Sequence, residues 1–445
     1  MTSRRDFIRQ AALGAAAVSL GFPVVSDGKN RKVIGANDVI RIGVAGVNSR
    51  GLALATTFAK MPKCEVAAVC DVDSLALERC REKLYEQTLK RPAGYKDIRK
   101  MLESKDIDAL VVAMPDHWHA TAAIMGLQAG KHVYLEKPTS YCPSENEALL
   151  AVAAKNPRRV ITVGNQRRSW PNVIEAVDAV RNGEIGRVRF ASSWYTANRP
   201  SIGRGNNVPV PENLDWDLWQ GPAPRVEGFH DNYIHYNWHW FYRWGTGEAL
   251  NNGTHFVDIL RWGLGVAYPT LVTSVGGRFR YHDDWEFPDT QIITYQFGDT
   301  AAGSWEGRSC NSTPIHGYGV GVAFYGENGT LVLGGGNEYK VLDMRGNVIK
   351  DRKSDLAFAP GDLFNPSEKL DMLHFENWFS AIRTGSALNS TLKDACISTQ
   401  LVQLGNIAQR TGESLAIDPS SGHILNASEA ARTLFTREYE PGWEI

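Results

Sequence analysis

The stretch of sequence that decides the fold is Val39-Ile40-Arg41-Ile42-Gly43-Val44-Ala45-Gly46-Val47-Asn48-Ser49-Arg50-Gly51. The part up to Val47 is rich in β-branched and small residues, a pattern that predicts a buried strand. Residues 52–60 follow with helical spacing. A strand, a tight turn and a helix in direct succession are typical of the first unit of a parallel, doubly wound sheet.

The turn between this strand and this helix has the spacing of the glycine pattern that binds dinucleotides, with Asn48 at the middle glycine position. The first glycine permits a sharp turn, and the backbone N–H groups that open the helix face the pyrophosphate. Asparagine tolerates left-handed backbone angles better than most residues, so it weakens the pattern without breaking it. The predicted nucleotide contacts in this turn are Gly46, Asn48, Ser49, Arg50 and Gly51.

Asp71 ends the next predicted strand, residues 65–70, twenty residues after Gly51. A carboxylate at this position accepts hydrogen bonds from the adenosine ribose hydroxyls and repels a 2′-phosphate, which favours NAD over NADP. Arg50 leaves NADP open as a cofactor, because a guanidinium suits phosphate.

Strand and helix candidates alternate as far as Gly164, which predicts a parallel Rossmann-type sheet. After Gly186 strand candidates follow one another, which predicts a second α/β domain with an open, mainly antiparallel sheet. Residues 197–236 are rich in Pro, Gly and Asn and predict a long surface excursion. The predicted second-domain strands span 187–197, 271–281, 290–297, 301–306, 319–325 and 329–333.

The domain division that follows from this order has four parts. We expect a signal segment at 1–32 and a nucleotide-binding domain at 38–168. A substrate and oligomerisation domain is expected at 169–390. Residues 391–445 are expected to form a helix, at 393–410, and an irregular tail that pack back on the first domain.

The chain has 445 residues, 22% of them charged, with a formal net charge of −1. This balance argues against nucleic acid and anionic membranes as partners. Six cysteines lie scattered without C-x-x-C spacing, which argues against a zinc site or a redox pair and predicts mostly free thiols.

The N-terminal residues have the pattern of a targeting segment. Arg4-Arg5 precede an apolar run at 11–22 that is shorter than the ~20 residues needed to span a bilayer. Adjacent arginines ahead of such a run match the twin-arginine address, which exports folded proteins. We therefore expect a periplasmic or otherwise exported protein without stable membrane insertion.

Two further segments carry a family resemblance: Met114-Pro115-Asp116-His117-Trp118-His119 after strand 109–113, and Glu136-Lys137-Pro138 after strand 132–135. Together with the glycine turn they resemble the Gfo/Idh/MocA oxidoreductases, over roughly residues 39–265. The resemblance implies NAD as cofactor, a sugar or cyclitol substrate, and a homo-oligomer formed through the open sheet. The further cofactor contacts expected on this basis are Met114, Pro115, His117, Trp118, Glu136, Lys137 and Gln166.

Three catalytic residues are expected from the same resemblance. Lys137 corresponds to the lysine that lies beside the nicotinamide and the substrate hydroxyl. The family's D-x-x-x-H pair corresponds to Asn251 and His255, so an amide replaces the carboxylate. An amide orients a hydroxyl but cannot take its proton, and the proton transfer therefore falls to His255 and Lys137.

The segment from Tyr233 to Trp244 is dense in aromatic and imidazole groups, which can bind the flat faces and hydroxyls of sugars. We predict that His235, Tyr236 and His239 contact substrate, with part of the aromatic set serving as inter-domain core instead. His235 and His239 stand four apart, yet no carboxylate or cysteine has matching spacing, so no metal site is predicted.

The predicted function is hydride transfer between tightly bound nicotinamide cofactor and a hydroxyl-bearing carbon of a sugar, glycoside or cyclitol. The alternative is an NAD-dependent glycosidase or lyase that oxidises C3 transiently and eliminates the glycosidic group. A third hypothesis is a noncatalytic sugar-binding protein with a vestigial nucleotide site.

Overall fold

The computed structural model describes residues 34–35, 38–356 and 366–445, and the predicted signal segment lies outside these ranges. From Asp38 onward the described residues belong to one compact unit. Within them, no helix combines the length and the apolar character needed to cross a bilayer.

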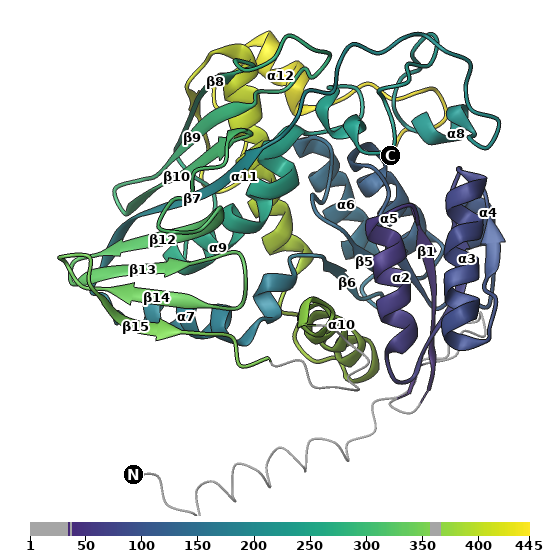
Figure 1. Cartoon of the computed structure of the whole chain (residues 1–445), viewed down its shortest axis with the longest axis horizontal. Coiled ribbons are helices and arrows are strands. Elements are labelled where there is room, and N and C mark those ends of the chain that lie inside the picture. Colours follow the sequence, from purple (N-terminus) through teal and green to yellow (C-terminus); the bar gives the residue numbers. More distant parts are fainter. Residues whose placement is uncertain (1–33, 36–37, 357–365) are drawn as a thin grey trace, which may run out of the picture. The chain divides into compact units, whose positions relative to one another are not determined.

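The first sheet has six parallel strands in the order β3-β2-β1-β4-β5-β6 (Figure 1). This is the strand order of dinucleotide-binding doubly wound folds and confirms the predicted Rossmann sheet. The order reverses between β1 and β4, so the turns that follow these two strands lie side by side. In sequence order the strands are Ile40–Ala45, Cys64–Cys70, Ala93–Tyr95, Ala109–Val112, His132–Leu135 and Ile161–Val163.

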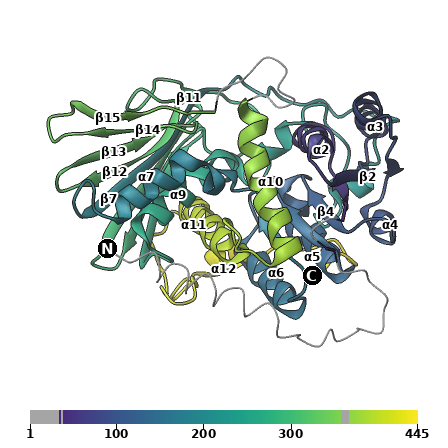
Figure 2. The same ribbon diagram turned by 90° about the horizontal axis from the view of Figure 1, so that it is seen from below.

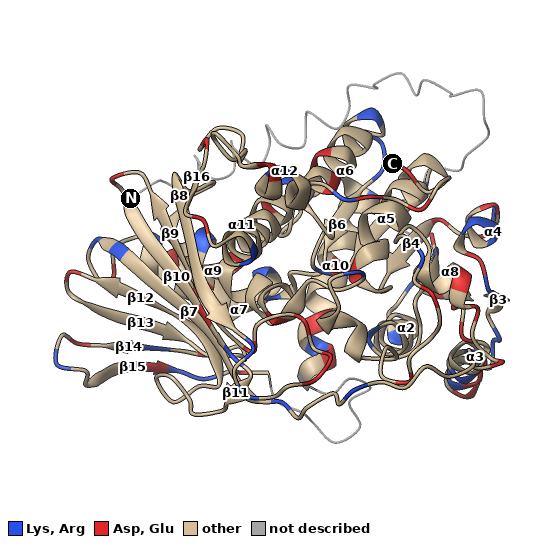
Figure 3. Ribbon diagram, turned by 90° about the horizontal axis from the view of Figure 1, so that it is seen from above, with Lys and Arg blue, Asp and Glu red and all other residues tan. Residues whose placement is uncertain are grey.

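The helices of this part are α2 to α6, with short 3₁₀ segments η1 and η2 after β4 and β6. α3 and α4 were not predicted, although Asp73 and Asp97 cap them by accepting backbone N–H bonds. Figure 3 shows Lys, Arg and Glu interspersed on α3, whereas α4 carries only the basic Arg99 and Lys100. In order, the elements are Arg50–Lys60, Ser74–Thr88, Ile98–Leu102, Asp116–Trp118 (η1), His119–Gln128, Pro143–Lys155 and Gln166–Ser169 (η2).

The second sheet runs β15-β14-β13-β12-β7-β10-β9-β8-β16, with β11 paired to β7. All neighbours are antiparallel except β7 and β10, which confirms a mainly antiparallel second sheet. Its strands are Val188–Asn198 (β7), Leu271–Gly277, Thr290–Phe297, Ala301–Arg308, Cys310–Asn311, Val320–Gly326, Gly329–Leu333, Tyr339–Leu342, Val348–Arg352 and Leu415–Ala416 (β16).

One face of the second sheet is covered by α7 (Pro171–Arg181), α9 (Thr254–Leu264) and α11 (Leu392–Thr411), as Figure 2 shows. The core under these helices is apolar, with Phe256 and Leu260 of α9 buried against Phe324 of β12. α11 also reaches the first sheet, because Thr399 Oγ1 accepts a bond from the Thr139 N–H at 3.3 Å.

Several predicted details differ from the structure. β8 ends at Gly277, four residues before its predicted end, because the Asp289 carboxylate accepts the backbone N–H groups of Phe279 and Arg280 and draws them out of the ladder. The tail predicted as irregular holds β16 and a helix, α12 (Glu429–Phe435).

The predicted surface excursion at 197–236 is partly buried. It contains α8 (Trp216–Gln220), and Leu214, Trp219 and Phe229 lie in an aromatic cluster with Trp244. Because this cluster borders the first domain's turns, the excursion forms one wall of the candidate site.

Candidate active site

The glycine turn has the geometry that its spacing predicts. Gly46 has φ +81°, and a Cβ there would lie 2.6 Å from the Ala113 carbonyl oxygen. A Cβ on Gly51 would lie 1.7 Å from the Gly46 carbonyl oxygen. A side chain at either position would therefore push β1, β4 and α2 apart. The Ser49 side chain makes no capping bond, which leaves the first N–H groups of α2 available to an anion.

Asn48 does not take the left-handed backbone conformation, which asparagine tolerates better than most residues. Its side-chain oxygen and its backbone oxygen instead accept bonds from Arg79 Nη2, at 2.6 and 2.8 Å. The middle position of the pattern thus holds a residue that ties the turn to α3.

Asp71 lies at the end of β2, beside the turn. Its carboxylate accepts the Val47 N–H at 2.7 Å and the Asp73 N–H at 3.0 Å. Burial raises the pKa of Asp71, and these two backbone bonds counteract the rise. The carboxylate is therefore held in place by the backbone and is half-buried in the cavity wall.

A pocket opens beside this turn. One wall comes from the first domain and the other from the aromatic segments that follow β7. The predicted site residues that line it are Gly46, Asn48, Ser49, Asp71, Met114, Pro115, Trp118 and His235.

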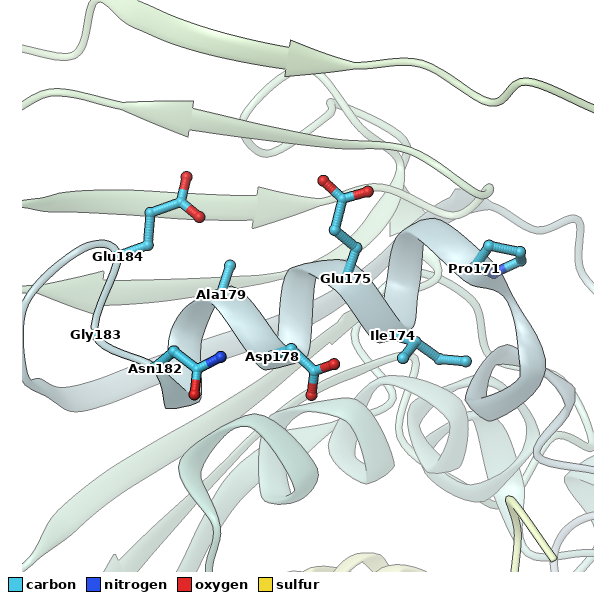
Figure 4. Close-up of a pocket in the computed structure, with 8 residues that line it drawn as sticks. All are labelled: Pro171, Ile174, Glu175, Asp178, Ala179, Asn182, Gly183 and Glu184. Carbon is cyan, nitrogen blue, oxygen red and sulfur yellow. The ribbon is translucent and has the colours of Figure 1, made fainter. Parts of the chain in front are cut away.

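A second depression runs along α7 and is shown in Figure 4, bordered by Glu175, Asp178 and Glu184. It contains none of the predicted site residues. Glu175 is engaged there with Tyr339 and Arg352, at 2.6 and 3.2 Å. This depression is therefore not the predicted active site.

His117 faces away from the cavity. It is fully buried, its Nε2 lies 3.0 Å from the Trp219 carbonyl oxygen, and burial lowers its pKa to about 3. Trp118 lines the cavity and donates from Nε1 to the same carbonyl at 3.0 Å. His117 and Trp118 thus both bond the Trp219 carbonyl and stabilise the wall, and the cofactor contact of His117 stays a prediction.

Arg50 turns toward the interior instead of toward Asp71. Its Nε donates to Glu136 at 2.9 Å and its Nη1 to Asp371 at 2.8 Å. Asp371 lies in α10 (Pro366–Thr384), a helix that was not predicted. The guanidinium is therefore engaged by two carboxylates, and its Nη2 has no hydrogen-bond partner among the described residues.

Lys137, on the turn after β5, points to the second domain. Its Nζ donates to the Asn251 carbonyl oxygen at 2.6 Å. Burial lowers the pKa of Lys137, while the carboxylates of Glu136, Asp116 and Glu248 counteract that effect. The structure thus brings Lys137 and Asn251 together and disfavours the ammonium form.

Asn251 lies in a π-helical turn, Ala249–Gly253, directly before α9. Such widened turns occur frequently at functional sites. His255 follows in the first turn of α9. Its pKa lies well below the usual value because of burial and the positive charges of Arg167, Lys137 and Arg50. Its Nδ1 has no hydrogen-bond partner among the described residues, so a neutral imidazole is left free to bind a ligand.

Gln166 opens η2 after β6, and its Oε1 is buried without a partner in the described part of the chain. A buried amide oxygen without a hydrogen bond costs free energy of folding unless a bound ligand donates a hydrogen bond to it.

The predicted substrate residues separate into two groups. The Tyr236 hydroxyl lies 3.4 Å from Asn251 Nδ2, and the His239 ring lies 4.6 Å from the Tyr236 ring. Burial lowers the pKa of His239 to about 4. His235 Nε2 instead lies 2.8 Å from Asp73 Oδ2, at the Asp71 end of the cavity. Because His235, Tyr236 and His239 lie close together in the sequence, nothing in the sequence indicated that the structure separates them.

Two residues near the site were missed from the sequence. Glu248 is buried beside Asn251, and Arg199 pairs with it. The only sequence signal is the position of Glu248 three residues before Asn251, which places the two one helical turn apart.

Fold and site together define a two-domain protein whose first domain has the geometry of a dinucleotide-binding Rossmann domain. Two family models agree: the oxidoreductase family NAD-binding Rossmann fold matches residues 40–164, and the oxidoreductase family C-terminal alpha/beta domain matches residues 213–417. The chain belongs to the Gfo/Idh/MocA oxidoreductase family, and its first domain is an NAD-binding domain.

Among curated relatives, a glycosyl hydrolase family 109 protein of Saccharopolyspora erythraea is 30% identical over 43% of this chain and 45% of its own length. An alpha-N-acetylgalactosaminidase of Shewanella oneidensis is 28% identical over 41% of each chain. The matched region thus spans less than half the length of either relative. Among solved structures, a levoglucosan dehydrogenase in complex with NADH and levoglucosan has a TM-score of 0.65 at 18% identity, covering 85% of this chain and 99% of that one.

Proposed function

We propose that the protein transfers a hydride between tightly bound NAD(H) and a hydroxyl-bearing carbon of a sugar, glycoside or cyclitol. The observation that carries this proposal is the convergence of Lys137, Asn251 and His255, which come from the two domains, near an NAD-binding turn. The carbohydrate part rests on the relatives, which are named as enzymes of glycosides and of an anhydrosugar.

The residues present fit a dinucleotide. Gly46 and Gly51 keep open a cradle that any Cβ would fill, Asp71 lines the cavity beside them, and the buried Gln166 Oε1 awaits a donor. When bound, the nicotinamide supplies a hydride acceptor or donor.

The chain's own residues would manage the substrate hydroxyl. The Asn251 amide orients it, and the neutral imidazole of His255 or the amine of Lys137 accepts its proton as the carbon is oxidised. Neutral forms of both groups are favoured by burial, which suits proton acceptance near neutral pH.

The test begins with purified protein that is denatured so that any released nucleotide can be identified by mass. Sugars, glycosides and cyclitols are then screened for a change in the near-ultraviolet absorbance of the bound cofactor. A bound dinucleotide and a substrate-dependent change are expected. Protein without nucleotide that binds sugar unchanged would favour the noncatalytic hypothesis.

A second candidate is the NAD-dependent glycosidase, favoured by the names of the two curated relatives. Oxidation at C3 would acidify the C2 proton, the chain's base would remove it, and the C1–O bond would break with loss of the aglycone. Water would then add at C1 with a proton returned to C2, and hydride would return to C3. Release of nitrophenol from a nitrophenyl glycoside without net NADH formation would select this candidate.

Export in a folded state is also proposed, on the basis of Arg4-Arg5 and the apolar run after them. Changing both arginines to lysine should retain the protein in the cytoplasm, whereas the unchanged chain should be recovered from the periplasm. Equal distribution of the two proteins would remove the twin-arginine assignment.

Association of copies through the second sheet is proposed from its uncovered face. Val275 and Ile292 are cross-strand neighbours with 68% and 41% of their surface exposed, and Phe190 stacks on Tyr325 with ring centroids 5.6 Å apart. Light scattering should show an oligomer that Ile292→Glu dissociates. A wild-type monomer would contradict this.

A further inference from the structure

Glu248 is a buried carboxylate that joins several groups of the candidate site. It lies directly before the π-helical turn, with 4% of its surface exposed. It accepts bonds from the Asn252 amide and from Arg199 Nε, from Ser309 Oγ at 3.2 Å and from Asn251 Nδ2 at 3.4 Å. The same carboxylate therefore holds the amides of two successive residues of the turn.

Arg199, the main partner of Glu248, follows strand β7 and lies among the aromatic side chains of the proposed substrate region. Its guanidinium is 5.6 Å from the Tyr236 ring centroid and 5.0 Å from that of Trp240. Its Nη2 donates to the Tyr195 hydroxyl at 3.1 Å. The ion pair thus connects the π-helical turn to the rings that a sugar would contact.

Resting on the proposed function, we propose that Glu248 is a positioning residue of the active site. It fixes the Asn251 amide for the substrate hydroxyl and holds a negative charge near Lys137. Position 251 itself carries an uncharged amide, so the carboxylate that serves this part of the site stands one helical turn earlier in the chain.

The charges around Lys137 support this role. Three carboxylates stabilise its ammonium form, against the effects of burial and of Arg50. Glu136 is bound by Arg50, and Asp116 accepts a bond from the Thr246 hydroxyl, so each has its own partner in the same region. Glu248 is the one of the three that also bonds Asn251. Glu248 also counteracts the lowering of the His239 pKa by burial, as Asp116 does, and it contributes to the raised pKa values of Tyr195 and Arg199.

The first test replaces Glu248 by glutamine, which keeps the shape and removes the charge. The pH dependence of Lys137 is read directly from holoprotein by labelling amines with acetic anhydride at a series of pH values and quantifying the Lys137 peptide by mass spectrometry. In Glu248→Gln the labelling midpoint should move to lower pH, because an opposite charge has been removed. An unchanged midpoint overturns the inference, whatever the enzyme's activity.

The second test uses the sugar-dependent absorbance change. Glu248→Gln should lower kcat about 10- to 100-fold through misplacement of the hydroxyl, with nucleotide content unchanged. Because this variant leaves Arg199 buried without its partner, the double variant Glu248→Gln, Arg199→Gln is measured beside it. Recovery of wild-type kcat in the double variant would mean that Glu248 only pairs with Arg199, and would overturn the positioning role.

The matched control is Glu327→Gln, which breaks the exposed pair with Arg187 at the edge of the second sheet, 2.8 Å long. It should leave both the labelling midpoint and kcat unchanged. If wild-type holoprotein responds to no sugar, the proposed function fails, whereas the labelling experiment still decides whether Glu248 sets the charge at Lys137.

Discussion

The ammonium of Lys137 and the backbone carbonyl of Asn251 are joined by a 2.6 Å hydrogen bond that links the turn after β5 to the π-helical turn before α9. The bond connects the nucleotide-binding part of the chain to the part that carries His255. It therefore brings the candidate proton acceptors into one place, with Lys137 held by an uncharged acceptor.

Replacing Lys137 by methionine should remove the amine while filling its space. We expect turnover to fall by about 10²- to 10⁴-fold, the usual contribution of a positioned acid or base, with nucleotide retained. Steady-state rates and the mass of released nucleotide measure the two effects. Lys131→Met is the control, since Lys131 also donates to carbonyls, those of Ser104 and Ile107, at 2.7 Å each. Lys131→Met should lower the free energy of unfolding without changing turnover. Equal loss of turnover in both variants would take Lys137 out of the mechanism.

Gly46→Ala should abolish nucleotide binding, because its Cβ would meet the Ala113 backbone at 2.6 Å. Gly183→Ala is a matched control: its φ of +80° is close to the +81° of Gly46, yet nothing lies within 4 Å of a Cβ there. Gly183→Ala should cost only the backbone strain, about 1 kcal/mol of unfolding free energy, and keep its nucleotide. Nucleotide content and chemical denaturation distinguish the two. A Gly46→Ala protein that keeps full nucleotide would contradict the steric argument.

Five of the six strands of the first sheet, its glycine turn and Asp71 could be predicted because those strands have a local apolar pattern, and parallel strands end at a common edge. β3 (Ala93–Tyr95) was not predicted, because none of its three residues is buried. The partners that complete the site could not be predicted. Arg50 and Asp371 are 321 residues apart, and Arg199 and Glu248 are 49 apart on segments without a regular pattern.

The helix α3 was missed for a different reason. Only Ala76, Cys80 and Leu84 are buried in it, so its apolar stripe is too narrow to stand out among charged residues. For the segment from 233 to 244, the sequence could not indicate the directions in which the side chains point. Neighbouring histidines in it face opposite ends of the site, because the chain there follows the aromatic cluster instead of a regular helix.

Asp71→Asn should weaken the preference for NAD. The change removes the negative charge that repels a 2′-phosphate, while Arg50 stays bound to Glu136 and Asp371 through Nε and Nη1. We therefore expect discrimination against NADP to fall about 10-fold, mainly through weaker NAD binding. Dissociation constants of both nucleotides, measured by calorimetry on protein freed of its cofactor, provide the check. An unchanged NAD to NADP ratio would show that Asp71 does not face the ribose.

His117→Gln should make the protein less sensitive to acid. Burial lowers the pKa of His117 from 6.5 to about 3, so between these values the unfolded chain binds a proton that the folded chain does not. Stability therefore rises with pH in this window, is fully present above pH 6.5 and is lost as pH falls. At pH 5 the loss from this group is about 2 kcal/mol. Glutamine can donate to the Trp219 carbonyl and has no such titration. The unfolding free energies of wild type, His117→Gln and the exposed His282→Gln are compared at pH 7 and pH 5. His117→Gln should lose less stability than the other two, and an equal loss in all three would show that His117 is protonated in the folded protein.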